Sequence, residues 1–369
     1  MKMLTNAQRE CFGLKPICDH WECFLAKPSP YDHHKTYLYL DGNEIVKCIM
    51  VGNTQYYEYE LAEKTTPDRK YLLPKTLKGK PVLLSSSNIE KRKGTGMRLN
   101  YNEKNVNLYN ENTECSYYYN TYHKESFCDL ESFLEWAEKW RTETTHEDRA
   151  DILHFSQAVR NHVKYQDGDV FRFKIDRRHY GYGRVLLDYS KMRKNKEPFW
   201  DILMSKPVVC SVYHVFTERK DLSIGELKNC KSLPSTIVAD NGLFYGEYEI
   251  IGNLPITEQE DYPIMYGNSI DYREKAVCYQ CGKVFRKFAG RSAPSNAFIN
   301  NSVSFSFNFN LDVLLQCIEE GSNAPYWAGY YTSFTERDLR NPKHAEKLKL
   351  IKQKMGLLSQ KVLKDMPDT

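Results

Sequence analysis

Two groups of side chains in this 369-residue chain have types and spacing that could support chemistry. The first is the CxxC pair Cys278 and Cys281, which would supply half of a structural zinc site. A second pair at suitable spacing is missing, and the run around the pair is strand-like, whereas redox pairs precede a helix. The adjacent His33 and His34 would point to opposite faces of a strand. We therefore predict no metal site and no cofactor.

The second group is the stretch 171–196, where basic residues alternate with aromatic ones. Such interleaving is typical of nucleic-acid-binding surfaces, and also of a hairpin with one solvated face. His179 follows Arg177 and Arg178, whose charges disfavour its protonated form, so it is either a base or a solvent-facing turn residue. No nucleophile, base and orienting group lie within sequence reach of one another, and the sequence predicts no enzyme.

The elements that must position this second group are two strands. A strand from Gly168 to Ile175, a polar turn at 176–179 and a strand from Tyr180 to Leu187 predict a β-hairpin. Glycines inside a strand mark a bulge or a close backbone approach, as expected at Gly181 and Gly183. These two lack the third glycine of a dinucleotide-binding loop, and a strand continues where the helix should begin.

The composition sets broad limits on the class of protein. A hydrophobic content of 41% is enough for two domains, and a net charge of +4 neither requires nor excludes a nucleic acid partner. The eleven cysteines are odd in number, and the N-terminus lacks the apolar run of a secretory signal. No stretch approaches the roughly twenty apolar residues of a membrane helix. We expect a soluble cytoplasmic protein, not bound to membranes, with mostly free thiols.

The first half of the chain predicts a strand-rich domain over residues 1–163. Residues 1–35 are irregular in pattern, 36–110 are strand-like, and Asp41-Gly42 and Gly52-Asn53 predict tight hairpins. A helix capped by Asp129 follows, and then a second helix from about Glu147 to His162. Strands followed by helices indicate an α+β domain of unassigned function.

The second half predicts a further domain over residues 164–340. A capping box at Ser223 and Glu226 predicts a short helix, and strict alternation over 303–309 predicts a strand. Residues 310–320 predict a helix ended by Gly321, and residues 341–369 predict a basic amphipathic helix. We predict an α+β fold of antiparallel sheets, in which this half is a curved sheet or partial barrel with packed helices.

Three blocks of this half follow one another in a distinctive order: GDVF from Gly168, YGYGRVL from Tyr180, and IIGNLPI from Ile250. In this order they resemble the immunity protein 26 family of bacterial polymorphic toxin systems, over roughly residues 165–290. Tyr248 stands where members often carry Trp. The motif residues to which the resemblance assigns a structural role are Gly168, Asp169, Phe171, Gly181, Gly183, Gly252 and Pro255.

The resemblance implies a non-enzymatic function, in which the protein neutralises a cognate toxin by binding it. A few aromatic and arginine side chains usually dominate such an interface. An exposed-looking turn next to aromatics would supply them, and the alternative is a nucleic-acid-binding protein that uses the basic aromatic hairpin at 171–196. The predicted binding residues are Arg177, Arg178, His179, Tyr180 and Tyr182.

Overall fold

The computed structural model describes residues 3–28, 32–103, 105–122, 127–195, 206–268, 276–289, 304, 306–307, 309–328, 335–354 and 356–357. The chain forms two compact units. The first holds residues 1–161 and the short segment Lys174–Arg178, and the second holds 162–173 and 179–369. The sequence prediction placed the boundary at 163 and did not anticipate the return of Lys174–Arg178 to the first unit.

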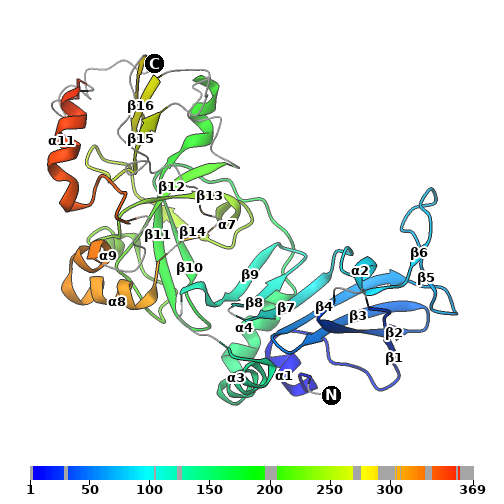
Figure 1. Ribbon diagram of the computed structural model, residues 1–369. Coiled ribbons are helices and arrows are strands. Elements are labelled where there is room, and N and C mark those ends of the chain that lie inside the picture. Colours follow the sequence, from blue (N-terminus) through cyan, green and yellow to red (C-terminus); the bar gives the residue numbers. More distant parts are fainter. Residues whose placement is uncertain are drawn as a thin grey trace. The chain divides into compact units, whose positions relative to one another are not determined.

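The first unit is built on a seven-stranded antiparallel sheet with the order β1-β2-β3-β4-β7-β8-β9 (Figure 1). The predicted hairpin at Asp41-Gly42 is present, because Asp41 pairs with Glu44 and Gly42 has a φ of +57°. A two-stranded ribbon, β5 (Tyr71–Leu72) and β6 (Val82–Leu83), is separate from the sheet. The sheet strands are β1 (Glu22–Leu25), β2 (His34–Asp41), β3 (Glu44–Gly52), β4 (Gln55–Lys64), β7 (Thr95–Asn102), β8 (Asn105–Asn110) and β9 (Cys115–Tyr119).

Alternation along β4 separates the two faces of this sheet. Tyr56 packs with Phe133 and Trp140 of helix α3 (Leu130–Glu143), whereas Tyr59 packs on the other face with Ile89 of helix α2 (Ser86–Ile89). Helix α3 begins at the predicted cap, where the Asp129 carboxylate accepts a hydrogen bond from the Ser132 backbone N–H. The tyrosine-rich composition thus serves the core of this unit.

Two expectations for the first unit were wrong in extent. The second helix, α4, spans only His146–Ser156, and Val159 of its predicted apolar face is exposed. Residues 1–35 are not wholly irregular, because they contain helix α1 (Asn6–Cys11) and strand β1. A capping box between Thr5 and Gln8 begins α1, a signal too short to stand out from the sequence. The unit also contains the 3-10 turn η1 (Asn120–Tyr122).

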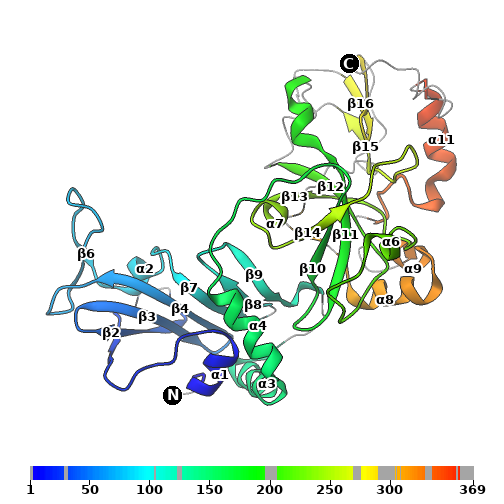
Figure 2. The same cartoon turned by 180° about the vertical axis from the view of Figure 1, so that it is seen from behind.

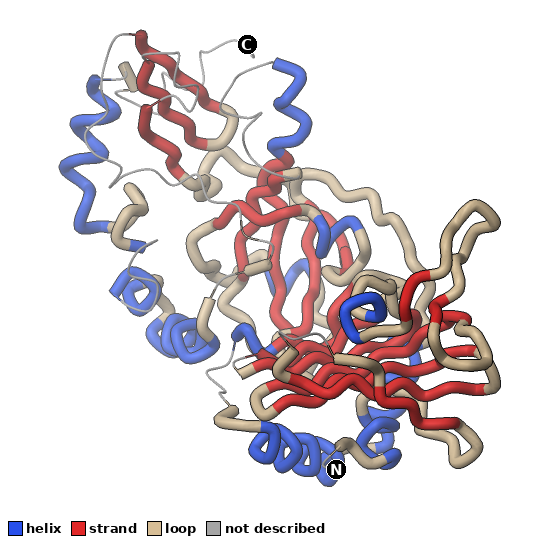
Figure 3. Tube along the Cα trace, turned by 45° about the vertical axis from the view of Figure 1, so that its right-hand side comes forward, coloured by secondary structure: helices blue, strands red, loops and turns tan. Residues whose placement is uncertain are grey.

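The second unit contains a five-stranded sheet with the order β13-β12-β11-β10-β14 (Figure 2). The pairs β10–β14, β11–β12 and β12–β13 are antiparallel. The predicted hairpin forms two of its strands, and the Ile250 block forms the edge strand beside them. A separate three-stranded antiparallel sheet, β15-β16-β17, belongs to the same unit (Figure 3). The strands are β10 (Asp169–Lys174), β11 (Tyr180–Asp188), β12 (Pro207–Val212), β13 (Thr236–Ala239), β14 (Glu249–Asn253), β15 (Ile264–Asn268), β16 (Ala276–Cys281) and β17 (Val284–Ala289).

Two helices of the second unit have the predicted caps. Ser223 and Glu226 form the capping box, and Gly321 ends helix α8 in the left-handed conformation with a φ of +57°. The predicted strand at 303–309 is wrong where the structure describes it: Ser304 makes only an isolated bridge, and Phe307 and Phe309 are buried outside any strand. The helical elements are η2 (Tyr189–Asn195), α6 (Ile224–Leu227), α7 (Asn241–Phe244), α8 (Leu311–Glu320), α9 (Ala324–Ala328), η4 (Pro342–His344) and α11 (Ala345–Lys354).

The predicted C-terminal helix is present as α11, whose Ile351 is buried against Leu339 and Leu357. The part of that prediction that falls on 358–369 lies outside the described residues. Strands in separate antiparallel sheets, with helices packed on them, confirm the α+β fold class. Over the described residues, no helix has both the length and the apolar character needed to cross a membrane.

Candidate functional site

The hairpin β10–β11 is fastened at its base by the residues of the GD and IIGN blocks. Gly168 has a φ of +90°, and a Cβ placed there would lie 2.7 Å from the Leu254 carbonyl oxygen. The Asp169 carboxylate accepts hydrogen bonds from the Gln166 backbone N–H and from the Asn253 side chain, both at 2.8 Å. These contacts join the start of β10 to the end of β14.

An aromatic cluster fills one face of this sheet. A Cβ at Gly183 would lie 2.5 Å from the Phe171 ring, so the close approach expected at a strand glycine is present there. Phe171 stacks on Tyr248 and on Phe307, with ring centroids 5.5 and 5.7 Å apart. Tyr248 is buried and therefore keeps an aromatic ring where the resembled family often has Trp.

The opposite face of the sheet packs on helix α6. Tyr182 is fully buried with Leu227, and its hydroxyl donates a hydrogen bond to the Arg219 carbonyl oxygen at 2.7 Å. A Cβ at Gly252 would lie 2.9 Å from Ile224 of that helix. Arg184 donates hydrogen bonds to the Leu254 and Pro255 carbonyl oxygens, which holds the end of the IIGNLPI block against β11.

Arg177, a predicted binding residue, is occupied within the first unit. Its guanidinium lies 4.5 Å from the centroid of the Trp140 ring and donates hydrogen bonds to the Trp140 carbonyl oxygen and the Thr144 hydroxyl. Its side chain is only 10% exposed. Burial lowers the pKa of Arg177, and the charge of Asp148 opposes that shift.

Arg178 shares the carboxylate of Asp148 with Arg177, at 2.6 and 3.1 Å respectively. Burial by itself would raise the pKa of Asp148. The hydrogen bonds from Arg178 and the Thr145 backbone N–H, together with the two arginine charges, outweigh burial and lower that pKa to about 2. The Arg178 side chain remains 41% exposed, so its outer edge reaches solvent.

Of the three other predicted binding residues, one is accessible. Tyr180 and Tyr182 are buried in the second unit, whereas the His179 side chain is 30% exposed. The His179 ring stacks on Phe216 with centroids 4.2 Å apart, and its Nε2 lies 3.7 Å from the Glu218 carboxylate. The five predicted residues therefore do not form one exposed group, and their binding role stays a prediction.

The segment 216–220, to which no sequence motif assigned a function, lies beside His179. Tyr180 and Thr217 form an isolated antiparallel bridge, which brings the segment 216–220 next to the end of the hairpin. The Lys220 ammonium and the Arg172 guanidinium lie 5.4 and 5.5 Å from the centroid of the Tyr180 ring. We call His179, Phe216, Glu218, Arg219 and Lys220 the 179/216 patch.

The sequence held only a weak signal for this patch. Residues 216–220 read FTERK, an aromatic residue followed by two cations in a loop before the capping box. Their proximity to His179 depends on the bridge between Tyr180 and Thr217, which no local pattern encodes. The patch carries both signs of charge, because it contains Glu218 beside Arg219 and Lys220. Arg219 also pairs with Asp221 and Glu226 next to the patch.

The CxxC pair does not converge on a common site. Cys278 and Cys281 lie three residues apart in β16, so their side chains project to opposite faces of the strand. Burial raises the pKa of Cys281, which disfavours its thiolate. None of the eleven cysteines, all of which lie in the described residues, forms a disulfide.

A comparison with known protein families gave a match to part of the chain. No curated protein and no solved structure matches the chain. A protein-family model described as immunity protein 26 matches residues 166–276, a range that contains the β10–β11 hairpin, the 179/216 patch, α6 and β14. The blocks that begin at Gly168, Tyr180 and Ile250 thus belong to a segment, residues 166–276, that matches the immunity protein 26 family.

Proposed function

We propose that this chain is an immunity protein that neutralises a cognate bacterial toxin by binding it directly. The observation that carries the proposal is the match of residues 166–276 to the immunity protein 26 family, which indicates a toxin-immunity role. Binding without catalysis is consistent with a CxxC pair that does not converge, and with a His179 that stacks on Phe216. The toxin would be held by surface burial of roughly 800 Å² on each partner.

We propose the 179/216 patch as the centre of the toxin interface. It combines a stacked pair of rings with the exposed Arg219, and aromatic and arginine side chains usually carry most of the energy of an interface. Of the five binding residues predicted from the sequence, His179 is the one that belongs to this patch. The buried Tyr180 and Tyr182 would support the patch from beneath.

The test of the function is co-expression with a candidate toxin encoded beside this protein in its genome. We expect the full-length chain to restore growth of cells that express the toxin. The two proteins should then co-purify in a fixed ratio, and the purified complex should lack the toxin's activity. Growth arrest that persists despite good expression of a folded chain, with no complex formed, would contradict the proposal.

The test of the interface is a charge reversal at Arg219 and Lys220 together, each changed to Glu. We expect the affinity for the toxin to fall at least tenfold, about 1.4 kcal/mol. In the matched control, the exposed Lys349 and Lys352 of α11 are changed to Glu, which makes the same charge change outside the patch. Equal affinities for both double variants would place the interface elsewhere without touching the proposed function.

The alternative function, nucleic acid binding through residues 171–196, is less well supported, because several of the described cations in this stretch are paired with carboxylates. Arg172 pairs with Glu249, Lys174 with Asp151, and Arg178 with Asp148. Cations already paired with carboxylates release few counterions on binding a phosphate backbone. Nucleic acid recovered with the protein and lost in moderate salt would nevertheless revive this function.

A further inference from the structure

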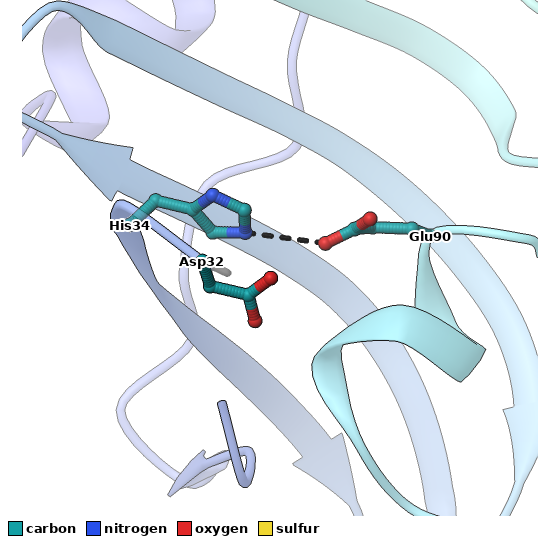
Figure 4. Close-up of side chains that lie close together, drawn as sticks. All are labelled: Asp32, His34 and Glu90. Carbon is teal, nitrogen blue, oxygen red and sulfur yellow. Dashed lines mark hydrogen bonds and ion pairs between the residues drawn. The ribbon is translucent and has the colours of Figure 1, made fainter. Parts of the chain in front are cut away.

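Three potential metal ligands converge in the first unit, outside the segment that matches the family. Asp32, His34 and Glu90 each offer one ligand atom, and these atoms all lie within 4.8 Å of one another (Figure 4). His34 is the first residue of β2 and Asp32 precedes it by two positions, while Glu90 directly follows helix α2. The chain therefore brings together ligands that are 56 residues apart.

The spacing of two of these atoms suits a small divalent cation. The His34 Nε2 atom lies 3.2 Å from the Glu90 Oε1 atom. Ligand atoms at about 2.0–2.2 Å from a zinc ion are separated by roughly 3 to 3.5 Å when they occupy neighbouring positions. An imidazole with two carboxylates also balances the charge of a divalent ion, and this mixture of nitrogen and oxygen suits zinc among the first-row metals.

Buried hydroxyl groups support the ligands from behind. The Ser86 hydroxyl donates a hydrogen bond to Glu90 Oε1 at 3.0 Å and lies 3.4 Å from His34 Nε2. The Thr36 hydroxyl lies 2.7 Å from that of Ser86, and both residues are buried. Partners of this kind orient ligands in known metal sites. On the outer side, the Glu90 side chain is 39% exposed and the His34 side chain 14%, which leaves a path from solvent.

We propose that Asp32, His34 and Glu90 form a binding site for one divalent transition-metal ion, with zinc as the best fit. The ion would fasten the start of β2 to the end of α2 and would keep at least one coordination position for water. Bound metal would therefore stabilise the first unit, since an ion that binds only the folded state raises its stability by mass action.

The test is a calorimetric titration of the metal-free, reduced, full-length protein with zinc chloride. The protein has eleven cysteines outside disulfides, and their thiols could also bind zinc. The titration must therefore identify the equivalent of zinc whose binding depends on the proposed ligands. We expect one equivalent whose affinity falls at least tenfold in His34→Ala and in the isosteric Glu90→Gln. The same equivalent should raise the thermal unfolding temperature of the wild type but not of these two variants.

The matched control is His20→Ala. His20 is 67% exposed and lies 3.7 Å from the Asp41 carboxylate, a histidine–carboxylate pair that is not part of the three-ligand group. The His20→Ala variant should bind zinc with the same affinity as the wild type. Zinc binding that is the same in His34→Ala, Glu90→Gln and His20→Ala, or no binding beyond that removed by blocking the thiols, would overturn the proposal.

Discussion

At the scale of single residues, the first unit holds a charge cluster with almost no access to solvent. The Glu58 carboxylate accepts hydrogen bonds from Arg9 at 2.8 Å, from Lys47 at 2.6 Å and from the Tyr56 hydroxyl at 2.5 Å. Lys47 and Glu58 are 0% exposed. Burial by itself would raise the pKa of Glu58, but the two neighbouring cations hold it below its ordinary value.

We expect Glu58→Gln to lower the free energy of unfolding by about 3–5 kcal/mol, because two cations would remain buried without a counter-charge. Urea denaturation of the wild type and the variant measures this loss. The matched control is Glu44→Gln at an exposed position of β3, which should change stability by less than about 0.5 kcal/mol. Similar losses for both variants would contradict the role of the cluster.

The contribution of Asp148 to the free energy of unfolding should decrease in acid. Its pKa of about 2 in the folded protein lies below the value of about 3.9 in an unfolded chain. Its contribution to stability is therefore complete above about pH 4 and is lost as the pH falls towards 2. We expect the difference in free energy of unfolding between wild type and Asp148→Asn to be largest above pH 4 and to narrow towards pH 2.

Denaturant titrations at several pH values between 2 and 6 measure that difference. Asp19→Asn, at an exposed position, serves as the control and should follow the wild type throughout. If the difference between wild type and Asp148→Asn stays constant with pH, pairing with the arginines does not lower the pKa of Asp148.

At the scale of elements, the second strand of the hairpin depends on close packing. At Gly183, an added Cβ would meet the Phe171 ring at 2.5 Å and the Ser211 carbonyl oxygen at 2.7 Å. We expect Gly183→Ala to cost about 1–3 kcal/mol by overpacking. The control is Gly225→Ala in helix α6, where the nearest atom lies at 3.8 Å and alanine favours the helix.

Thermal unfolding of the two alanine variants makes the comparison. Gly183→Ala should melt below the wild type, whereas Gly225→Ala should match or exceed it. A Gly183→Ala protein as stable as the wild type would mean that β11 can move away from Phe171, and that the glycine serves some other purpose.

Local sequence signals predicted the ends of helices well where a capping residue is present. Helix α3 begins at Asp129, α6 begins at the Ser223 capping box, and α8 ends at Gly321, each as expected. The predicted strand at 303–309 was wrong in its described part, because Phe307 enters the aromatic cluster beneath Phe171 instead of pairing its backbone. Alternation recorded the burial of these rings but not the hydrogen bonding of the chain.

At the scale of the whole molecule, each of the two units consists of two separate segments of the chain. Residues Lys174–Arg178, the tip of the hairpin whose strands lie in the second unit, are part of the first unit. Arg177 packs there on Trp140 of α3, and Arg178 pairs with Asp148 of α4. The segment that matches the family therefore supplies residues to the first unit.

We expect Arg177→Ala to weaken hydrogen-exchange protection in α3 and α4 more than in β11 and β12, because it removes the stacking on Trp140 and the hydrogen bonds to Trp140 and Thr144. Exchange mass spectrometry of the full chain measures both regions. Lys139→Ala, at a 72% exposed position of α3, is the control and should leave both unchanged. Loss of protection confined to β11 and β12 would contradict the assignment of the tip.

The sequence by itself determined the α+β class, the hairpin and the family resemblance, because periodicity, caps and the order of motif blocks are all local or nearly local. Tertiary structure alone decided which predicted binding residues reach solvent. Tyr180 and Tyr182 are buried, Arg177 is held by Trp140, and His179 is joined by Phe216. Exposure depends on what packs against a side chain, and residues 37 positions away in the chain have no fixed relation to the hairpin until the chain folds.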